Sequence, residues 1–202
     1  MTAVRPALDA STLPTTTFSH RSLAWWGTVG FMAIEGTTLF IAVVAYFYLR
    51  RNFAAWPPEH ILRPDLFWPT VQVILLLASL VPVVLADRAA YRIDVPRLRR
   101  WLLVALGFEI VAVVIRWQEF LALNVRWDTN AYGSVVWTLV GFHTTLLLVD
   151  VLETAVLLGI LYSKRRLERH ISDATDVTFY WYFLVATWIP LYVIVYLSPR
   201  FM

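Results

Sequence analysis

The sequence has no cysteine, three methionines and only four histidines in 202 residues. Without cysteine the chain cannot form a disulfide, a thiolate metal site or a cysteine nucleophile. Haem, copper and di-iron sites need several His, Cys or Met ligands at defined spacing, and only His143 lies inside a long apolar run. The sequence also lacks a glycine-rich phosphate loop and the spacing of a nucleophile triad. We therefore expect no metal site, no bound cofactor and no catalytic centre in this chain.

Charge is scarce as well. Only 15% of the residues are charged, 59% are hydrophobic, and the mean hydropathy is +0.65, a composition that favours a membrane protein. The net charge of +3 comes from arginines in short segments between apolar runs, so it does not form the basic stripe of a nucleic-acid-binding protein. We expect membrane helices and no nucleic-acid partner.

The apolar runs predict an all-α integral membrane protein. About 20 apolar residues cross the hydrocarbon core of a bilayer, and most of these runs are at least that long. The expected transmembrane helices are 22–49, 66–86, 101–123, 132–162 and 177–199. Residues 1–21 are polar and predict a cytoplasmic tail, so that 22–202 form a single transmembrane domain.

The third run is the weakest of the five. Three charged residues interrupt it: Glu109, Arg116 and Glu119. It predicts either a transmembrane helix with buried charge or a helix at the membrane surface. The segments 87–100 and 163–176 are the richest in basic residues, and they face the same side only if the third run crosses. The positive-inside rule therefore favours five spans, a cytoplasmic N-terminus and an external C-terminus.

Glu35 lies fourteenth in the first span, near the expected midplane of the bilayer. A carboxylate there is costly, so the side chain should face protein or water and be neutral. One interpretation is proton handling or a hydrogen bond to a partner subunit. The other is a structural glutamic acid bonded to a helix carbonyl or to a hydroxyl, for which Thr37 and Thr38 are near in sequence.

Small residues recur every three positions in the same span: Gly27, Gly30, Ala33 and Gly36. They allow a neighbouring backbone to approach closely, either within this chain or from another subunit. Aromatic and basic residues predict contacts with lipid or with the membrane interface. We select four candidates for such contacts: Trp25, Trp26, Arg116 and Trp181.

The fourth span carries His143, Asp150 and Glu153. His143 and Asp150 are seven residues apart, so they share a helix face but are too distant to bond directly. They predict either a polar seam toward water, lipid or a partner, or a satisfied core histidine beside separately paired acids.

The charged residues of the third span also offer pairs. Arg116 and Glu119 are three residues apart, and we expect a solvated salt bridge at the end of the helix. Glu109 is deeper and is expected to pair with a basic or polar group of another helix.

Several stretches together resemble subunit III of the haem–copper oxidases. They are GFMAIEGTTLFIAVVAYFYLR at 30–50, RWQEFLAL at 116–123, YGSVVWTLVGFHTTLLLVD at 132–150 and YWYFLVATWIPLYVIVYL at 180–197. Glu35 matches the glutamate in the middle of that family's corresponding helix, and Gly141-Phe142-His143 matches its Gly-Phe-His motif. The order and spacing of the motifs cover nearly everything from 25 to 197, in the manner of the shorter bacterial members.

This sequence departs from the family pattern at four positions. Leu146 occupies a position where the family usually has a second histidine. Asp150 occupies a later position where the family has a small residue, usually glycine. Tyr182 replaces a histidine, and Val185 replaces an acid. The polar pairs of the last two helices are therefore expected to differ from those of the family.

The resemblance implies a non-catalytic core subunit of a respiratory terminal oxidase in a bacterial or archaeal cytoplasmic membrane. It implies contact with subunit I, which carries haems and copper, and with subunit II. It also implies two helix bundles with a phospholipid-binding cleft, support of proton uptake, and membership of a respiratory supercomplex.

Two other functions stay open at this point. One is a subunit III-like accessory protein of a nitric oxide reductase. The other is a small proton-coupled transporter with Glu35, Asp150 and Glu153 as the coupling acids. A redox enzyme in its own right is excluded by the ligand count.

Overall fold

The computed structural model describes residues 23–163 and 167–201, with the side chains of 167–170 left aside. This part of the chain contains helices and loops and no strand. The helices are α1 (Leu23–Arg51), α2 (Phe67–Tyr91), α3 (Val95–Ala122), α4 (Ala131–Tyr162), α5 (Leu167–Tyr192), the π-helical turn η1 (Val193–Leu197) and α6 (Ser198–Phe201). The predicted tail at 1–21 lies outside the described residues. The side chain of His170 lies outside the described side chains.

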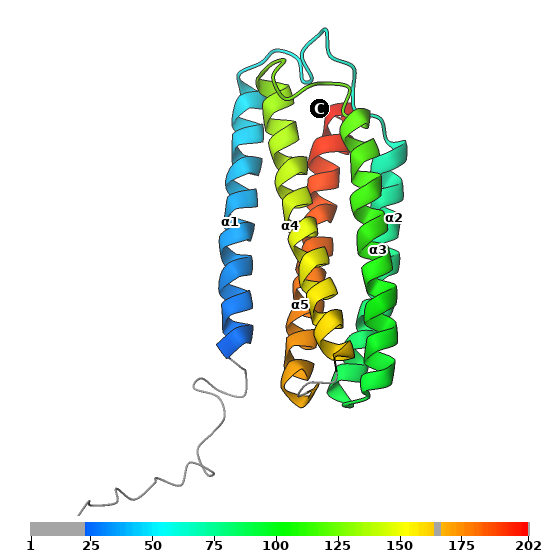
Figure 1. Cartoon of the computed structure of the whole chain (residues 1–202). Coiled ribbons are helices and arrows are strands. Elements are labelled where there is room, and N and C mark those ends of the chain that lie inside the picture. Colours follow the sequence, from blue (N-terminus) through cyan, green and yellow to red (C-terminus); the bar gives the residue numbers. More distant parts are fainter. Residues whose placement is uncertain (1–22, 164–166, 202) are drawn as a thin grey trace, which may run out of the picture.

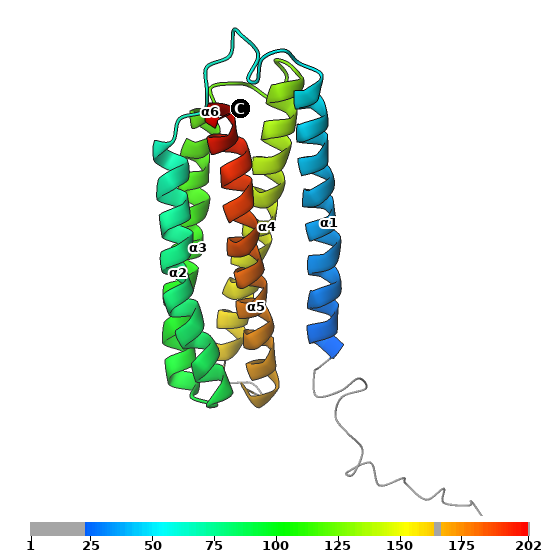
Figure 2. The same cartoon turned by 180° about the vertical axis from the view of Figure 1, so that it is seen from behind.

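The five long helices run up and down along one common direction (Figure 1). One end of the bundle holds the start of α1 and the connection from α2 to α3. The end of α4 and the start of α5 lie at the same end. The two long loops and α6 lie at the other end (Figure 2). We call these the first and the second end. The helix α1 is at the edge and packs on α4 and α5, while α2 packs on α3 and α5.

Four stretches are long and apolar enough to cross a membrane: α1, α2, α4 and the helix from Ile171 to Phe201. The helix α3 is not one of them, although its 28 residues run beside α2 and α4 along the bundle (Figure 1). Its charged residues explain the difference, since Glu109, Arg116 and Glu119 lower its hydropathy but lie buried inside the bundle.

Two helices begin earlier than their apolar runs. The helix α3 starts at Val95 because the Asp94 carboxylate accepts a hydrogen bond of 3.2 Å from the Arg97 backbone N–H, and Pro96 suits the first turn. The helix α5 starts at Leu167, ten residues before the predicted span. An apolar run reports only the part of a helix that contacts the hydrocarbon core, and polar first turns extend past it.

The last helix widens near its end. Pro190 has no backbone N–H, and the π-helical turn from Val193 to Leu197 follows it. The Arg200 guanidinium then donates hydrogen bonds of 2.5 Å to the Tyr196 carbonyl and 2.6 Å to the Pro64 carbonyl. The end of the chain is thereby fastened to the loop between α1 and α2.

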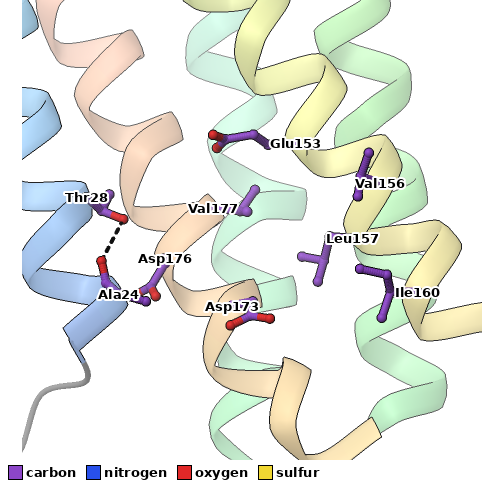
Figure 3. Close-up of a pocket in the computed structure, with 9 residues that line it drawn as sticks. All are labelled: Ala24, Thr28, Glu153, Val156, Leu157, Ile160, Asp173, Asp176 and Val177. Carbon is purple, nitrogen blue, oxygen red and sulfur yellow. Dashed lines mark hydrogen bonds between the residues drawn. The ribbon is translucent and has the colours of Figure 1, made fainter. Parts of the chain in front are cut away.

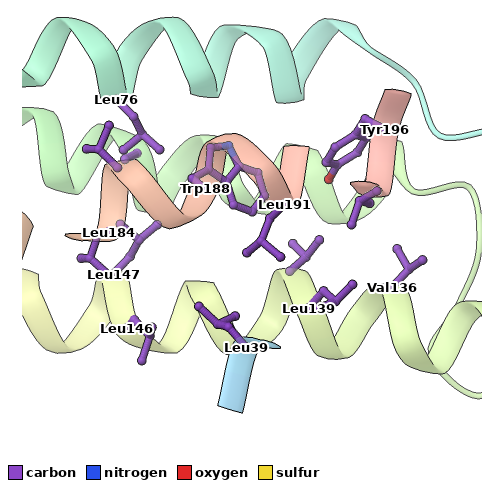
Figure 4. Close-up of a cluster of buried hydrophobic side chains, with 14 of the residues drawn as sticks. Leu39, Leu76, Val136, Leu139, Leu146, Leu147, Leu184, Trp188, Leu191 and Tyr196 are labelled. Atoms are coloured by element: carbon purple, nitrogen blue, oxygen red, sulfur yellow. The ribbon is translucent and has the colours of Figure 1, made fainter. Parts of the chain in front are cut away.

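The core lies where α4 and α5 meet the other helices. Leucines from four helices interdigitate with Trp188 and Tyr196 (Figure 4). The labelled side chains include Leu39 of α1, Leu76 of α2 and the pair Leu146–Leu147 of α4, each at most 5% exposed. These contacts place α4 and α5 at the centre of the bundle and bring their polar residues into its interior.

The start of α4 lies close against the preceding loop. The Asn130 side chain caps the helix by accepting a hydrogen bond of 2.8 Å from the Gly133 backbone N–H. A Cβ atom at Gly133 would collide with the Arg126 carbonyl oxygen. This close approach requires glycine at position 133.

Candidate functional site: the buried polar clusters

Glu35 is held by the last long helix. Its side chain is 5% exposed, and the Tyr180 hydroxyl of α5 donates a hydrogen bond of 2.8 Å to Glu35 Oε2. The two nearby threonines do not serve it, because the hydroxyls of Thr37 and Thr38 donate to the carbonyls of Ala33 and Ile34. The structural partner of Glu35 is therefore a phenol 145 residues away, which the sequence did not suggest.

A second cluster surrounds the Arg116 guanidinium of α3. One of its nitrogens lies 2.5 Å from Glu119 Oε2, and another donates a hydrogen bond of 3.3 Å to His143 Nδ1 on α4. The guanidinium carbon lies 3.7 Å from the centre of the Trp188 ring of α5, in cation–π contact. One planar cation thus joins three helices, which suits arginine better than lysine.

The two bonds of His143 define its tautomer. Its Nε2 lies 3.0 Å from the Leu184 carbonyl and must carry the hydrogen, since a carbonyl only accepts. Its Nδ1 faces the Arg116 donor and therefore accepts. His143 is fully buried and neutral, with both nitrogens used.

Two expectations for these residues were wrong. The Arg116–Glu119 pair is buried, with side chains 1% and 0% exposed, and is not a solvated salt bridge. Arg116 and Trp181 do not contact lipid or the membrane interface, since each is 1% exposed. The Trp181 Nε1–H donates a hydrogen bond of 2.8 Å to the Ser79 hydroxyl of α2. Both side chains turn inward because polar partners are available there.

The other two interface candidates lie at the edge of the bundle. Trp26 is 46% exposed, and Trp25 is half-buried and stacks on Phe179 with a ring distance of 5.8 Å. Contact with lipid stays a prediction for both.

A third cluster lies between α3 and α4, toward the first end. Glu109 and Asp150 are 3% and 0% exposed. The Thr154 hydroxyl donates a hydrogen bond of 3.2 Å to Glu109 Oε1, so the partner of Glu109 is a polar group of another helix. Asp150 and His143 belong to separate clusters, and the buried side chains of Leu146 and Leu147 lie between them in the sequence of α4.

An open hollow of about 310 Å³ lies at the first end between α1, α4 and α5 (Figure 3). Its apolar wall includes Val156, Leu157 and Ile160 of α4, and Ala24 and Thr28 line it from α1. Three acids line it: Glu153, Asp173 and Asp176. Glu153 is exposed and lies one turn from Asp150, so it connects this hollow with the third cluster.

The small residues of α1 divide into two groups. Gly36 faces the Phe183 ring of α5, at 3.6 Å from the position of a Cβ atom, and packs within this chain. Gly27 and Gly30 face open space, and Ala33 is exposed. These three leave room for a neighbouring backbone, and their contact with another subunit stays a prediction.

Three further polar side chains are buried in the bundle. Gln72, Tyr132 and Tyr196 are fully buried, and the Tyr196 ring meets the Trp188 ring edge-on at a centroid distance of 6.4 Å. The two tyrosines gave no signal in the sequence, because tyrosine is common in membrane helices. Gln72 is a polar residue in a mostly apolar run and could have been noticed. Among the described residues, no group of three or more His, Cys, Asp or Glu side chains is placed to hold a metal ion.

Comparisons with known proteins agree over most of the chain. Residues 16–199 match the sequence model of the family described as cytochrome c oxidase subunit III. A relative from Thermostichus vulcanus, named cytochrome c oxidase subunit 3, is 27% identical over 187 residues, which is 90% of each chain. A probable cytochrome c oxidase subunit 3 from Mycobacterium leprae is 27% identical over 84% of this chain and 85% of its own length. A haem–copper oxidase subunit I+III from Aeropyrum pernix is 27% identical over 82% of this chain and 22% of its own length.

Proposed function

The chain belongs to the cytochrome c oxidase subunit III family, and on this premise we propose that it packs against oxidase subunit I and stabilises it without carrying electrons. As a subunit III of a haem–copper oxidase it is part of aerobic electron transport. The observation that carries the proposal is the Aeropyrum pernix relative, whose name joins subunits I and III in one chain. We expect haem and copper in the partner subunits. We also expect this chain to contact subunit II.

We propose that all five long helices span the membrane. A helix of 28 residues such as α3 is about 42 Å long at 1.5 Å per residue, enough to cross a hydrocarbon core of about 30 Å. Its charged residues do not oppose this, because Glu109, Arg116 and Glu119 turn inward and bind groups of the bundle or of α3 itself. Lipid-facing positions such as Val111, Val114 and the ring of Trp117 are apolar.

The arrangement of the ends supports an orientation with the first end in the cytoplasm. Arg88, Arg92, Arg97, Arg99 and Arg100 lie near the connection of α2 and α3, at that end. Positively charged connections are retained on the cytoplasmic side. The start of α1 would then be cytoplasmic and the C-terminus external, in a bacterial or archaeal cytoplasmic membrane.

We further propose phospholipid contacts at the hollow of Figure 3. Its apolar wall suits acyl chains, and its acids, Glu153, Asp173 and Asp176, suit an amine-bearing headgroup better than an anionic one. Trp25 and Trp26 lie at the same end on α1, where amphipathic rings are typical of a membrane interface. We also propose that the chain supports proton uptake by the oxidase and that it takes part in a respiratory supercomplex.

The relatives favour this function over the two alternatives. Those reported above are named as subunits of cytochrome c or haem–copper oxidases, which supports the oxidase over a nitric oxide reductase. A transporter would need coupling acids that reach water from both sides in turn. Glu35 and Asp150 are instead buried against α5 and α3.

Purification of the tagged chain from its own membranes tests the association. We expect a haem-containing subunit I in the mass spectrum of the partners and a haem signal in the visible spectrum. Recovery of the chain without any haem protein, together with solute transport by the chain alone in liposomes, would overturn the proposal.

A variant tests the contribution of Glu35 to the oxidase. The Glu35→Ala oxidase is compared for oxygen consumption, proton pumping and retention of the subunit, with Glu59→Ala in an exposed loop as the control. We expect Glu35→Ala to lower at least one of the three and Glu59→Ala to lower none. Values equal to wild type for all three would exclude a role for Glu35.

A further inference from the structure

Two acids, Glu109 and Asp150, are buried between helices α3 and α4. Glu109 is on α3 and Asp150 on α4, and both side chains are almost completely buried. Thr154 lies one turn beyond Asp150 on α4 and binds Glu109 at 3.2 Å, which fixes Glu109 against the turn that also carries Asp150. The two carboxyl groups are close enough to act on each other electrostatically.

Three of their four oxygens have no hydrogen-bond partner. Glu109 Oε2 and both carboxyl oxygens of Asp150 are unpartnered among the described residues. In the described part of the chain, no arginine, lysine or histidine forms an ion pair with either acid. The pair therefore lacks the cation that usually accompanies buried carboxylates.

The other titratable groups around the pair give it no positive charge. Glu153 of α4 acts on Asp150 as a further acid, and Glu35 of α1 lies beyond Tyr180. Tyr180 of α5 also faces Asp150, but its hydroxyl donates to Glu35. The groups that face the pair from α1, α4 and α5 are thus acids and a phenol.

We propose that Glu109 and Asp150 share one proton and form a proton-binding site inside the bundle. Two carboxylates in a dry interior repel each other and are costly to bury. A single proton turns one carboxyl group into a hydrogen-bond donor and leaves the other as its acceptor. One bound proton thereby removes one negative charge and satisfies two of the unpartnered oxygens.

Exchange of this proton has a short route to the first end. Glu153 is one turn from Asp150, is exposed, and lines the hollow with Asp173 and Asp176 (Figure 3). Toward the second end, Leu146 and Leu147 are buried and apolar and separate Asp150 from His143. Among the described residues, the polar side chains that lead from the pair to the surface therefore lie toward the first end.

The site goes beyond the proposed role in the oxidase, since it depends on the interior of this chain alone. It rests on Asp150, which stands at a position where the family pattern has a small residue. We expect the site in this chain and in relatives with the same pair of acids.

Infrared difference spectroscopy on the purified complex at neutral pH tests the proposal. The wild type is compared with the double variant Glu109→Gln, Asp150→Asn, which keeps the shapes of both side chains. We expect the double variant to lose one protonated-carboxyl band, sensitive to deuterium oxide, and one carboxylate band. Loss of two carboxylate bands would mean that no proton is shared, and loss of two protonated bands would mean that each acid holds its own.

Two further variants keep the assignment falsifiable. Glu59→Gln in the exposed loop between α1 and α2 is the control and should lose no protonated-carboxyl band. Thr154→Val removes the donor to Glu109 and should shift one band of the pair without removing it. Spectra that do not respond to Thr154→Val, or bands that change when sodium is exchanged for potassium, would overturn the shared proton in favour of another acid or of a bound cation.

Discussion

The hydroxyl of Tyr180 donates a hydrogen bond of 2.8 Å to the carboxyl group of Glu35 and ties the edge helix α1 to α5. Both side chains are buried, at 2% and 5% exposure, so water cannot replace the donor. We expect Tyr180→Phe to lower the free energy of unfolding by about 1–3 kcal/mol, because it leaves a buried acceptor unsatisfied. Thermal unfolding of the purified protein in detergent measures the loss.

Tyr182→Phe is the matched control for this prediction. Tyr182 lies two residues away on the same helix and is half-buried. We expect its variant to unfold within about 0.5 kcal/mol of the wild type, the range of ordinary substitutions outside the core. Equal losses in both variants would show that the bond to Glu35 contributes nothing of its own.

The buried pair of Arg116 and Glu119 predicts non-additive effects of substitution. Glu119→Leu leaves the Arg116 charge buried without its carboxylate, which costs about 3–5 kcal/mol in comparable pairs. The double variant Arg116→Met, Glu119→Leu removes both charges and should be more stable than Glu119→Leu alone. A double variant that is less stable than the single variant would mean that Arg116 is stabilised mainly by His143 and Trp188.

Gly133 predicts a steric effect at the start of α4. Gly133→Ala places a methyl group against the Arg126 carbonyl oxygen, which belongs to the backbone and cannot rotate away. We expect a loss of stability of about 1–3 kcal/mol, as for other overpacked sites. The same substitution at Gly159, which faces open space in the same helix, should be neutral or slightly stabilising because alanine is the better helix former. Comparison of the two unfolding temperatures tests the difference.

The sequence was sufficient to predict the long helices, because their lengths follow from apolar runs. The fourth span was predicted at 132–162, and α4 is Ala131–Tyr162. Helix ends with polar turns were missed, as at α5, since nothing apolar distinguishes Leu167 from a loop. The existence of α3 was predicted, as was the pairing of Glu109 with a polar group of another helix, but the burial of the Arg116–Glu119 pair was not.

The side-chain partners could not be predicted, for a physical reason. A membrane helix is apolar on all its faces, so its pattern does not show which face is buried. Trp181 could equally well have faced lipid, but its indole turned inward to the Ser79 hydroxyl. The contact of Glu35 with Tyr180 joins residues 145 positions apart, and only the packing of α1 on α5 brings them together.

If α3 crosses the membrane as proposed, its two ends are accessible from opposite sides. The chain has no cysteine, so a single introduced cysteine is the only thiol. We consider Arg92→Cys before α3, Thr129→Cys after it and Ala54→Cys in the loop between α1 and α2, all at exposed positions. A membrane-impermeant maleimide is applied to intact cells and then to permeabilised ones.

With five spans and a cytoplasmic N-terminus, Thr129→Cys and Ala54→Cys should react in intact cells. Arg92→Cys should react only after permeabilisation, because α3 carries the chain across the bilayer between positions 92 and 129. Ala54→Cys serves as the control, since it depends on α1 alone. A helix at the membrane surface would instead make Arg92→Cys and Thr129→Cys react alike. That result would also leave the ion pair of Arg116 and Glu119 outside the hydrocarbon core.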